Sequence, residues 1–300
     1  MLEKEEIIHL PDDVFRLLRD LISEYCGLYF DDDFKAIIQK RLGRRLSTHR
    51  FDNFRDYYRY LLYDRRREEE LAAIIDILTV NETYFFRESN QFKALTDEIC
   101  EELKGLKRDS RKLRIWSAGC SSGEEPYRIA MLVLEKAELF RQWEVEIIGS
   151  DINQRVLHVA RKGVYRSNSL RATEEYFINK YFIREDNLFR VKDEVKNLVS
   201  FNSLNLLDPM KVKLVGTMDV IFCRNVLIYF KHDARKKVVE NFYQRLSDGG
   251  YLFLGHAESL MNISTAYTLK HLKNDMVYQK PKKAFVNISD DSLLRMVWKR

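Results

Sequence analysis

Residues 116–131 read WSAGCSSGEEPYRIAM, and the fold follows from this stretch. The apolar segment LRIWSA (113–118) leads into a turn that contains Gly119 and Gly123, and Pro126 then opens a second apolar segment. Glycine permits a tight turn and the close approach of a ligand, and proline suits the first turn of a helix. The stretch therefore predicts strand, glycine turn and helix, the unit with which doubly wound α/β folds bind nucleotide cofactors.

Two glutamates, Glu124 and Glu125, stand where this helix begins. Carboxylates there complement the positive end of the helix dipole. They would also repel a pyrophosphate, the usual ligand of such a turn, while accepting hydrogen bonds from hydroxyl or ammonium groups. The turn therefore favours a cationic nucleoside without phosphates, such as S-adenosylmethionine, over NAD, FAD or ATP.

Strand-like and helical segments alternate around this turn. Strands are expected at 113–118, 144–151, 218–224 and 250–255, and helices from Pro126, at 154–162 and at 234–246. Apolar strands separated by helices indicate a parallel sheet covered on both faces. Between about 165 and 203 shorter segments interrupt the alternation, which predicts a small antiparallel β-subdomain inserted before the fourth core strand.

The residues before the expected sheet show helical spacing and no strand-like pattern. After Asp12, apolar residues recur at helical spacing, and further helices are expected at 34–46, 54–63 and 68–78. We expect an all-helical domain over 1–80, a linker and connecting helix over 81–112, the sheet domain over 113–281 and a tail over 282–300.

The helical domain carries an uneven charge. Residues 34–67 hold eleven Lys or Arg against three Asp, a local surplus of eight positive charges, whereas the whole chain has a net charge of +5. Such a segment either attracts an acidic partner or forms a solvated helix face.

Composition excludes several classes of protein. Apolar residues make up 45% of the chain and charged residues 32%, as in ordinary globular proteins. The acidic start MLEKEEIIHL is no signal peptide and no apolar run approaches the ~18–20 residues of a membrane span, so a cytoplasmic location is expected. The four cysteines are dispersed and predict neither a disulfide framework nor a metal site.

Polar residues follow the expected strands at the edge where open α/β folds bind ligands. Asp151 ends the second strand, where it could bind a ribose or cap the following helix. Arg224 and Asn225 interrupt the apolar run FCRNVLIYF, and a buried strand has little structural reason to place them there. Asn205 could read a base edge or cap a turn.

The stretch NETYFFRE (81–88) lies where the two expected domains meet. Its aromatic residues belong to a core by default. The polar residues Asn81, Thr83 and Arg87 alternate with them, which indicates a lid or floor over the pocket.

Together, NETYFFRE, WSAGCSSGEEPYRIAM, GSDIN, NSLNLL and FCRNVLIYF resemble the chemotaxis receptor glutamate methyltransferases, in order and from about residue 10 to 280. The resemblance implies a Rossmann-like class I methyltransferase sheet with a small inserted antiparallel β-subdomain, preceded by an all-α domain. It also implies S-adenosylmethionine as methyl donor and S-adenosylhomocysteine as product.

Site residues are implied by the same resemblance. The cofactor would contact Asn81, Thr83, Arg87, Gly119, Glu125, Asp151, Asn205, Leu206, Arg224 and Asn225, with Glu125 favoured over Glu124. Arg87 and Tyr229 would lie nearest the transferred methyl and act in catalysis.

The implied substrate is a glutamate on the acidic helical bundle of a receptor. Lys40, Arg41, Arg44 and Arg45 would dock on that bundle. The segment FIREDNLFRV lacks the extra loop of family members that bind a receptor's C-terminal peptide, so no such tether is expected. We also expect a monomer that neither binds nucleic acid nor inserts into a membrane.

A glutamate with a pKa of ~4.3 is already ionised at neutral pH, so the reaction needs no general base. Catalysis would rest on alignment and on removal of water from the carboxylate. Alternatives are a methyltransferase of a non-flagellar chemosensory system and a non-catalytic cofactor-binding signalling protein. A nucleic-acid amino-methyltransferase would carry Asp/Asn-Pro-Pro-aromatic where this chain has CRNVLIYF.

Overall fold

The computed structural model describes residues 8–282. Four helices and a 3₁₀ turn form the N-terminal part, with the bounds α1 (Asp12–Cys26), η1 (Asp32–Phe34), α2 (Lys35–His49), α3 (Phe54–Tyr63) and α4 (Arg67–Leu78). One apolar stripe of each helix faces the others, and Leu18, Leu42, Leu61 and Ile74 are fully buried between them. These helices fall where apolar spacing predicted them.

A connecting helix follows. Its parts are α5 (Ser89–Ala94), a π-helical turn η2 (Leu95–Ile99) and α6 (Cys100–Leu106). Leu95, Ile99 and Leu103 are buried against one face of the sheet, which explains why this segment stays helical between the two domains.

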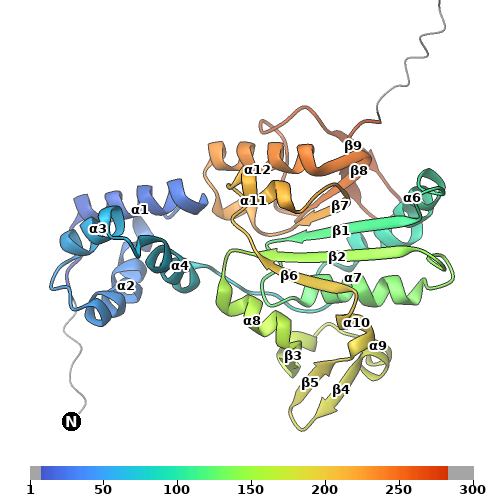
Figure 1. Cartoon of the computed structure of the whole chain (residues 1–300), viewed down its shortest axis with the longest axis horizontal. Coiled ribbons are helices and arrows are strands. Elements are labelled where there is room, and N and C mark those ends of the chain that lie inside the picture. The colour runs from blue at the N-terminus through green and yellow to red at the C-terminus, as the bar shows by residue number, and fades with distance from the viewer. Residues whose placement is uncertain (1–7, 283–300) are drawn as a thin grey trace, which may run out of the picture.

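The central sheet has the strand order β6-β2-β1-β7-β8-β10-β9 (Figure 1). Its strands are β1 (Lys112–Ala118), β2 (Glu144–Asp151), β6 (Val199–Ser203), β7 (Met218–Cys223), β8 (Leu246–Leu254), β9 (Thr268–His271) and β10 (Met276–Gln279). The five strands from β6 to β8 pair in parallel, and β10 and β9 add an antiparallel edge. The predicted fold class is confirmed.

Helices cover both faces of the sheet (Figure 1). They are α7 (Glu124–Glu135), α8 (Gln154–Lys162), α11 (Pro209–Leu214) and α12 (His232–Arg245), with the short turn η4 (Leu227–Tyr229) before α12. Successive residues of β1 point to opposite faces: Ile115 packs with α7, whereas Trp116 packs with Phe242 of α12. The core around Trp116 continues into the helical domain, so the two domains share apolar packing.

The inserted subdomain is a three-stranded antiparallel sheet of order β3-β5-β4. Its elements are β3 (Val164–Arg166), η3 (Ser167–Leu170), α9 (Glu175–Tyr181), β4 (Phe182–Glu185), β5 (Leu188–Val191) and α10 (Asp193–Lys196).

The prediction that the subdomain extends to residue 203 is wrong. β6 pairs in parallel with β2, with Ile147 opposite Val199, and is the edge strand of the central sheet. The alternation of residues in a five-residue strand can indicate a strand, but it does not indicate which strand it pairs with, because the partner lies far away in the sequence.

Within residues 8–282, no helix has both the length and the apolar composition that crossing a membrane requires. The expected tail over 282–300 lies outside the described residues, except for Lys282.

Candidate active site

A pocket opens where β1, β2 and β7 end, between the sheet and the helical domain. With its open mouth included, it encloses about 1030 Å³ of empty space. Every residue predicted to bind the cofactor or to act in catalysis lines this pocket: Asn81, Thr83, Arg87, Gly119, Glu125, Asp151, Asn205, Leu206, Arg224, Asn225 and Tyr229. Cys26 and Leu28 contribute a wall from the helical domain, which the sequence did not indicate.

The glycine turn lets the backbone itself form part of the pocket wall. Gly119 has a φ of +77°, and a Cβ at this position would lie 2.4 Å from Cγ2 of Val226. Its amide donates to the carbonyl of Ser150 at 2.7 Å, which joins the turn to the end of β2. A side chain at Gly119 would therefore both strain the turn and displace the neighbouring loop.

Asp151 lies at the end of β2 and is buried. Its carboxylate accepts from the amides of Ser121 at 2.8 Å and Asn153 at 2.9 Å. Burial raises the pKa of Asp151 above its ordinary value, although these hydrogen bonds oppose the shift. Asn153, not Asp151, caps α8, so the alternative capping role of Asp151 does not apply.

The two glutamates of the turn differ in where they point. Glu125 lines the pocket and accepts from Ser117 Oγ at 2.7 Å and Arg224 Nη1 at 2.8 Å. Glu124 is 2% exposed, bonds Ser122 Oγ at 2.7 Å and is absent from the pocket lining, and burial raises its pKa. Between the two, only Glu125 can face a bound molecule.

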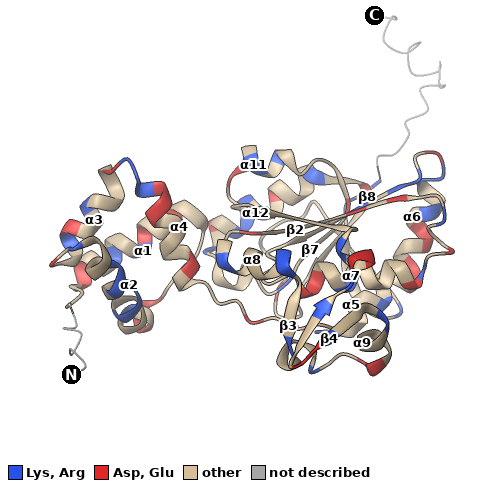
Figure 2. Ribbon diagram, turned by 60° about the horizontal axis from the view of Figure 1, so that its bottom comes forward, with Lys and Arg blue, Asp and Glu red and all other residues tan. Residues whose placement is uncertain are grey.

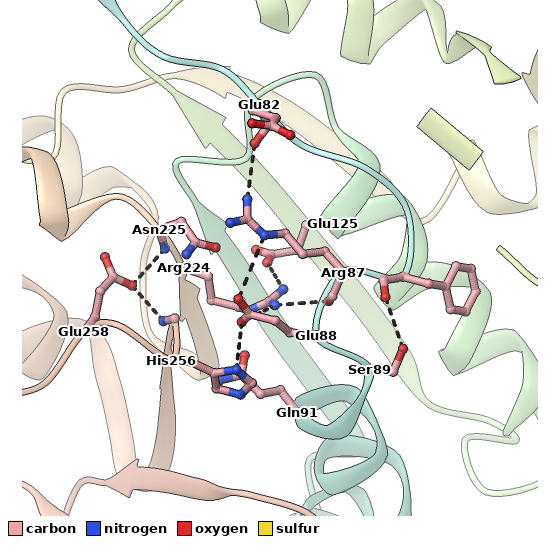
Figure 3. Close-up of polar contacts among 12 residues, drawn as sticks. Glu82, Arg87, Glu88, Ser89, Gln91, Glu125, Arg224, Asn225, His256 and Glu258 are labelled. Carbon is pink, nitrogen blue, oxygen red and sulfur yellow. Dashed lines mark hydrogen bonds and ion pairs between the residues drawn. The ribbon is translucent and has the colours of Figure 1, made fainter. Parts of the chain in front are cut away.

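Arg224 joins three segments beneath the pocket (Figure 3). Its Nη1 bonds Glu125, and its Nη2 bonds Glu88 at 2.8 Å and the carbonyl of Arg87 at 3.1 Å. Glu88 was not singled out from the sequence. It is the last residue of NETYFFRE, but the sequence around it does not indicate its partner, Arg224, which lies 136 residues further along the chain.

Arg87 lies on a constrained piece of backbone. Its neighbours Phe86 and Glu88 have φ values of 63° and 54°, in the left-handed region that non-glycine residues rarely occupy. Its Nη1 donates to the carbonyl of Glu82 at 3.3 Å, and its own carbonyl accepts from Arg128 at 3.0 Å. Such strain persists only where surrounding contacts determine the backbone, as at ligand sites.

Tyr229 is held by the helical domain. Its carbonyl accepts from the amide of Tyr29 at 2.9 Å, beside a β-bridge between Leu28 and Phe230. Asn205 also contacts this domain, because its Nδ2 donates to the carbonyl of Tyr25 at 2.6 Å. Oδ1 of Asn205 accepts from the amide of Leu207, so Asn205 caps a turn, one of its two predicted roles, while it lines the pocket.

Glu258 is another residue that the sequence did not indicate. Its carboxylate accepts from the amides of Asn225, Val226, Leu227 and Gly255 at 2.7–2.9 Å. Figure 3 shows Glu258 beside Asn225. It thereby fixes the loop between Arg224 and Tyr229. The only sequence signal was an acid in the loop after the last parallel strand.

Basic residues gather on α2 of the helical domain (Figure 2). Lys40, Arg41 and Arg44 are exposed, and Arg41 donates to the carbonyl of Ile77 at 2.8 Å. Arg45 does not fit the predicted docking set, because its guanidinium forms an ion pair with the buried carboxylate of Glu70. Its charge is compensated inside the domain.

Comparison with known proteins identifies the family. Residues 81–276 match the family described as "CheR methyltransferase, SAM binding domain", and residues 13–79 match "CheR methyltransferase, all-alpha domain". The chain belongs to the CheR methyltransferase family. The resemblance found in the sequence is confirmed.

Curated relatives match over most of the chain. "Chemotaxis protein methyltransferase 2" of Vibrio cholerae is 39% identical over 92% of this chain and 96% of its own length. The "Chemotaxis protein methyltransferase" of Borreliella burgdorferi is 37% identical over 83% and 88%, and that of Escherichia coli 35% identical over 90% and 92%. This CheR family member is therefore an S-adenosylmethionine-dependent methyltransferase of chemotaxis.

The pocket residues suit this cofactor. Asp151 and Glu125 offer carboxylates to hydroxyl and ammonium groups, and the bare backbone at Gly119 leaves room beside them. An acidic turn of this kind would repel a phosphate. The residues therefore fit S-adenosylmethionine better than a phosphorylated nucleotide.

Proposed function

We propose that this protein methylates glutamate side chains of methyl-accepting chemotaxis receptors and forms glutamate methyl esters. The observation that carries the proposal is that Arg87 and Tyr229 line the same pocket as the acidic cofactor turn. A cation and a phenol beside a methyl donor suit a carboxylate substrate. The names of the curated relatives support the chemotaxis context.

The reaction needs little from the protein beyond position. Bound S-adenosylmethionine supplies an activated methyl group. Arg87, about a third exposed at the pocket, orients the incoming carboxylate, and Tyr229 donates a hydrogen bond to it. The substrate carboxylate is ionised at neutral pH and attacks without a general base, so alignment and exclusion of water set the rate.

Docking is assigned to the helical domain. Lys40, Arg41 and Arg44 provide positive charge on α2, which raises the encounter rate with an acidic helical bundle. The two-residue turn between β4 and β5 leaves no long loop for a peptide tether, so we propose direct docking of a monomer. We also propose the division of the chain into a helical docking domain (1–80), a linker and connecting helix (81–112), a methyltransferase domain (113–281) and a tail (282–300).

A methyl-transfer assay tests it. Tritiated S-adenosylmethionine is offered with receptor-containing membranes, DNA and RNA in parallel. We expect label on the receptor alone, released by mild alkali as methanol, because methyl esters hydrolyse there. Label on nucleic acid, or on none of the three, would contradict the proposal.

Two variants test the catalytic pair. Arg87→Ala and Tyr229→Phe should lower kcat for receptor methylation by about tenfold or more, the value of one hydrogen bond to the ionised carboxylate. Affinity for S-adenosylhomocysteine is measured alongside. Unchanged methyl transfer in both variants would refute the assignment.

A further inference from the structure

Arg128 is a buried cation on the wall of the cofactor pocket. It lies on α7, one turn after the glycine turn, and is 3% exposed. The centre of its guanidinium lies 3.6 Å from the ring centroid of Phe92 and 4.4 Å from that of Phe86. Its Nη1 donates to the carbonyl of Arg87.

In the described part of the chain no carboxylate is paired directly with this charge, although the carboxylate of Glu125 stabilises it at longer range. Within residues 8–282 no acidic side chain forms an ion pair with Arg128, and its Nε has no hydrogen-bond partner. Arg224, next to it, has two carboxylate partners, Glu88 and Glu125. Burial, with the charge of Arg224, lowers the pKa of Arg128.

A buried charge without a direct ion-pair partner lowers the stability of the folded protein. Its place near the positive end of α7 adds to that cost. Cation–π contacts with the rings of Phe86 and Phe92 offset part of this free-energy cost. An apolar side chain could fill the same space between the rings without any such cost. The charge is therefore best explained by an anionic group that enters the pocket.

We propose that Arg128 binds the carboxylate of the methionyl part of S-adenosylmethionine. That carboxylate is the only anionic group of the cofactor, whose sulfonium and ammonium are cationic. The pocket carboxylates Glu125 and Asp151 suit the cationic and hydroxyl groups, and Arg224 is already neutralised by two acids. Of the three arginines that line the pocket, Arg87 is assigned by the proposed function to the substrate carboxylate, so Arg128 is left for the carboxylate of the cofactor.

Three ligands separate this role from a purely structural one. S-Adenosylhomocysteine carries the carboxylate, its carboxamide lacks the charge, and 5′-methylthioadenosine lacks the amino-acid part. Isothermal titration with the whole chain gives the Kd of each. Arg128→Met should weaken S-adenosylhomocysteine binding about tenfold or more, and the binding of the other two ligands about twofold or less.

Two further variants serve as controls. Arg190→Met removes an exposed arginine of β5, paired with Glu185, and should leave all three affinities unchanged. Arg128→Lys keeps the charge and should recover part of the preference for the carboxylate ligand. Because a buried charge without a direct ion-pair partner is removed, Arg128→Met without ligand should melt no lower than the original chain.

Equal losses for all three ligands in Arg128→Met would overturn the proposal in favour of a packing role. If that variant does not fold, the original chain still decides: equal affinity for S-adenosylhomocysteine and its carboxamide would overturn it. Neither result depends on the receptor substrate, so failure here is distinct from failure of the proposed function.

Discussion

Arg224 and Glu125, 99 residues apart in the chain, form a 2.8 Å ion pair beneath the cofactor pocket. The pair joins the end of β7 to the first turn of α7, and the second guanidinium nitrogen of Arg224 continues to Glu88. The three segments that form the pocket floor are thus joined by one buried side chain.

Arg224→Met should lower the free energy of unfolding by about 3–5 kcal/mol, because it leaves two carboxylates without their cation in a buried place. Urea denaturation measures the loss. Arg190→Met, which breaks the exposed pair with Glu185, should cost about 1 kcal/mol or less. Similar small losses in both variants would mean that the Arg224 contacts contribute little.

Gly119→Ala should reduce affinity for S-adenosylhomocysteine by about tenfold or more, since the new Cβ meets Val226 and the φ of +77° disfavours alanine. Calorimetric titration gives the affinity. Gly43→Ala is the matched control: apart from the backbone of its own helix and its chain neighbours, nothing lies within 4 Å of its would-be Cβ, and it should stabilise α2 by up to about 1 kcal/mol. Normal binding by Gly119→Ala would show that the turn tolerates a side chain.

Raising the salt concentration from about 0.1 M to about 1 M should slow receptor methylation more than it weakens cofactor binding, because screening shortens from ~10 to ~3 Å. Lys40→Ala with Arg44→Ala should reduce kcat/KM for the receptor and flatten this salt dependence. Arg141→Ala, an exposed change elsewhere, should do neither. Initial rates with receptor membranes measure the effect, and equal salt sensitivity of rate and binding would exclude electrostatic docking.

Stability in acid should depend on Glu102. Burial opposes its ionisation, but hydrogen bonds from Lys270, Tyr251 and Lys282 lower the pKa of Glu102 to about 2. The unfolded value is ~4.3, so this contribution is complete above pH ~4.3 and is lost as the pH falls towards 2. Glu102→Gln should therefore flatten the fall in unfolding free energy between these values, measured by urea denaturation at several pH values; an unchanged slope would contradict the assignment.

Prediction from the sequence succeeded where periodicity or a turn carries the information. The helical bundle, the parallel strands and the glycine turn are local patterns that the structure reproduces. The parallel pairing of β6, the ion pair of Arg45 with Glu70, and the contacts of Glu88, Glu258 and Arg128 were missed. Each depends on a partner from a distant segment, and no local pattern specifies that partner.

By itself, the sequence determined the fold class, the cofactor and the residues that would gather at the ends of the strands, because strand ends and glycine turns are local features whose meeting place follows from a parallel sheet. Only the tertiary structure decided which of the adjacent glutamates faces the pocket, which arginines are neutralised, and that the helical domain supplies a wall. Burial and charge compensation are properties of side chains brought together by packing, so they exist only once the chain has folded.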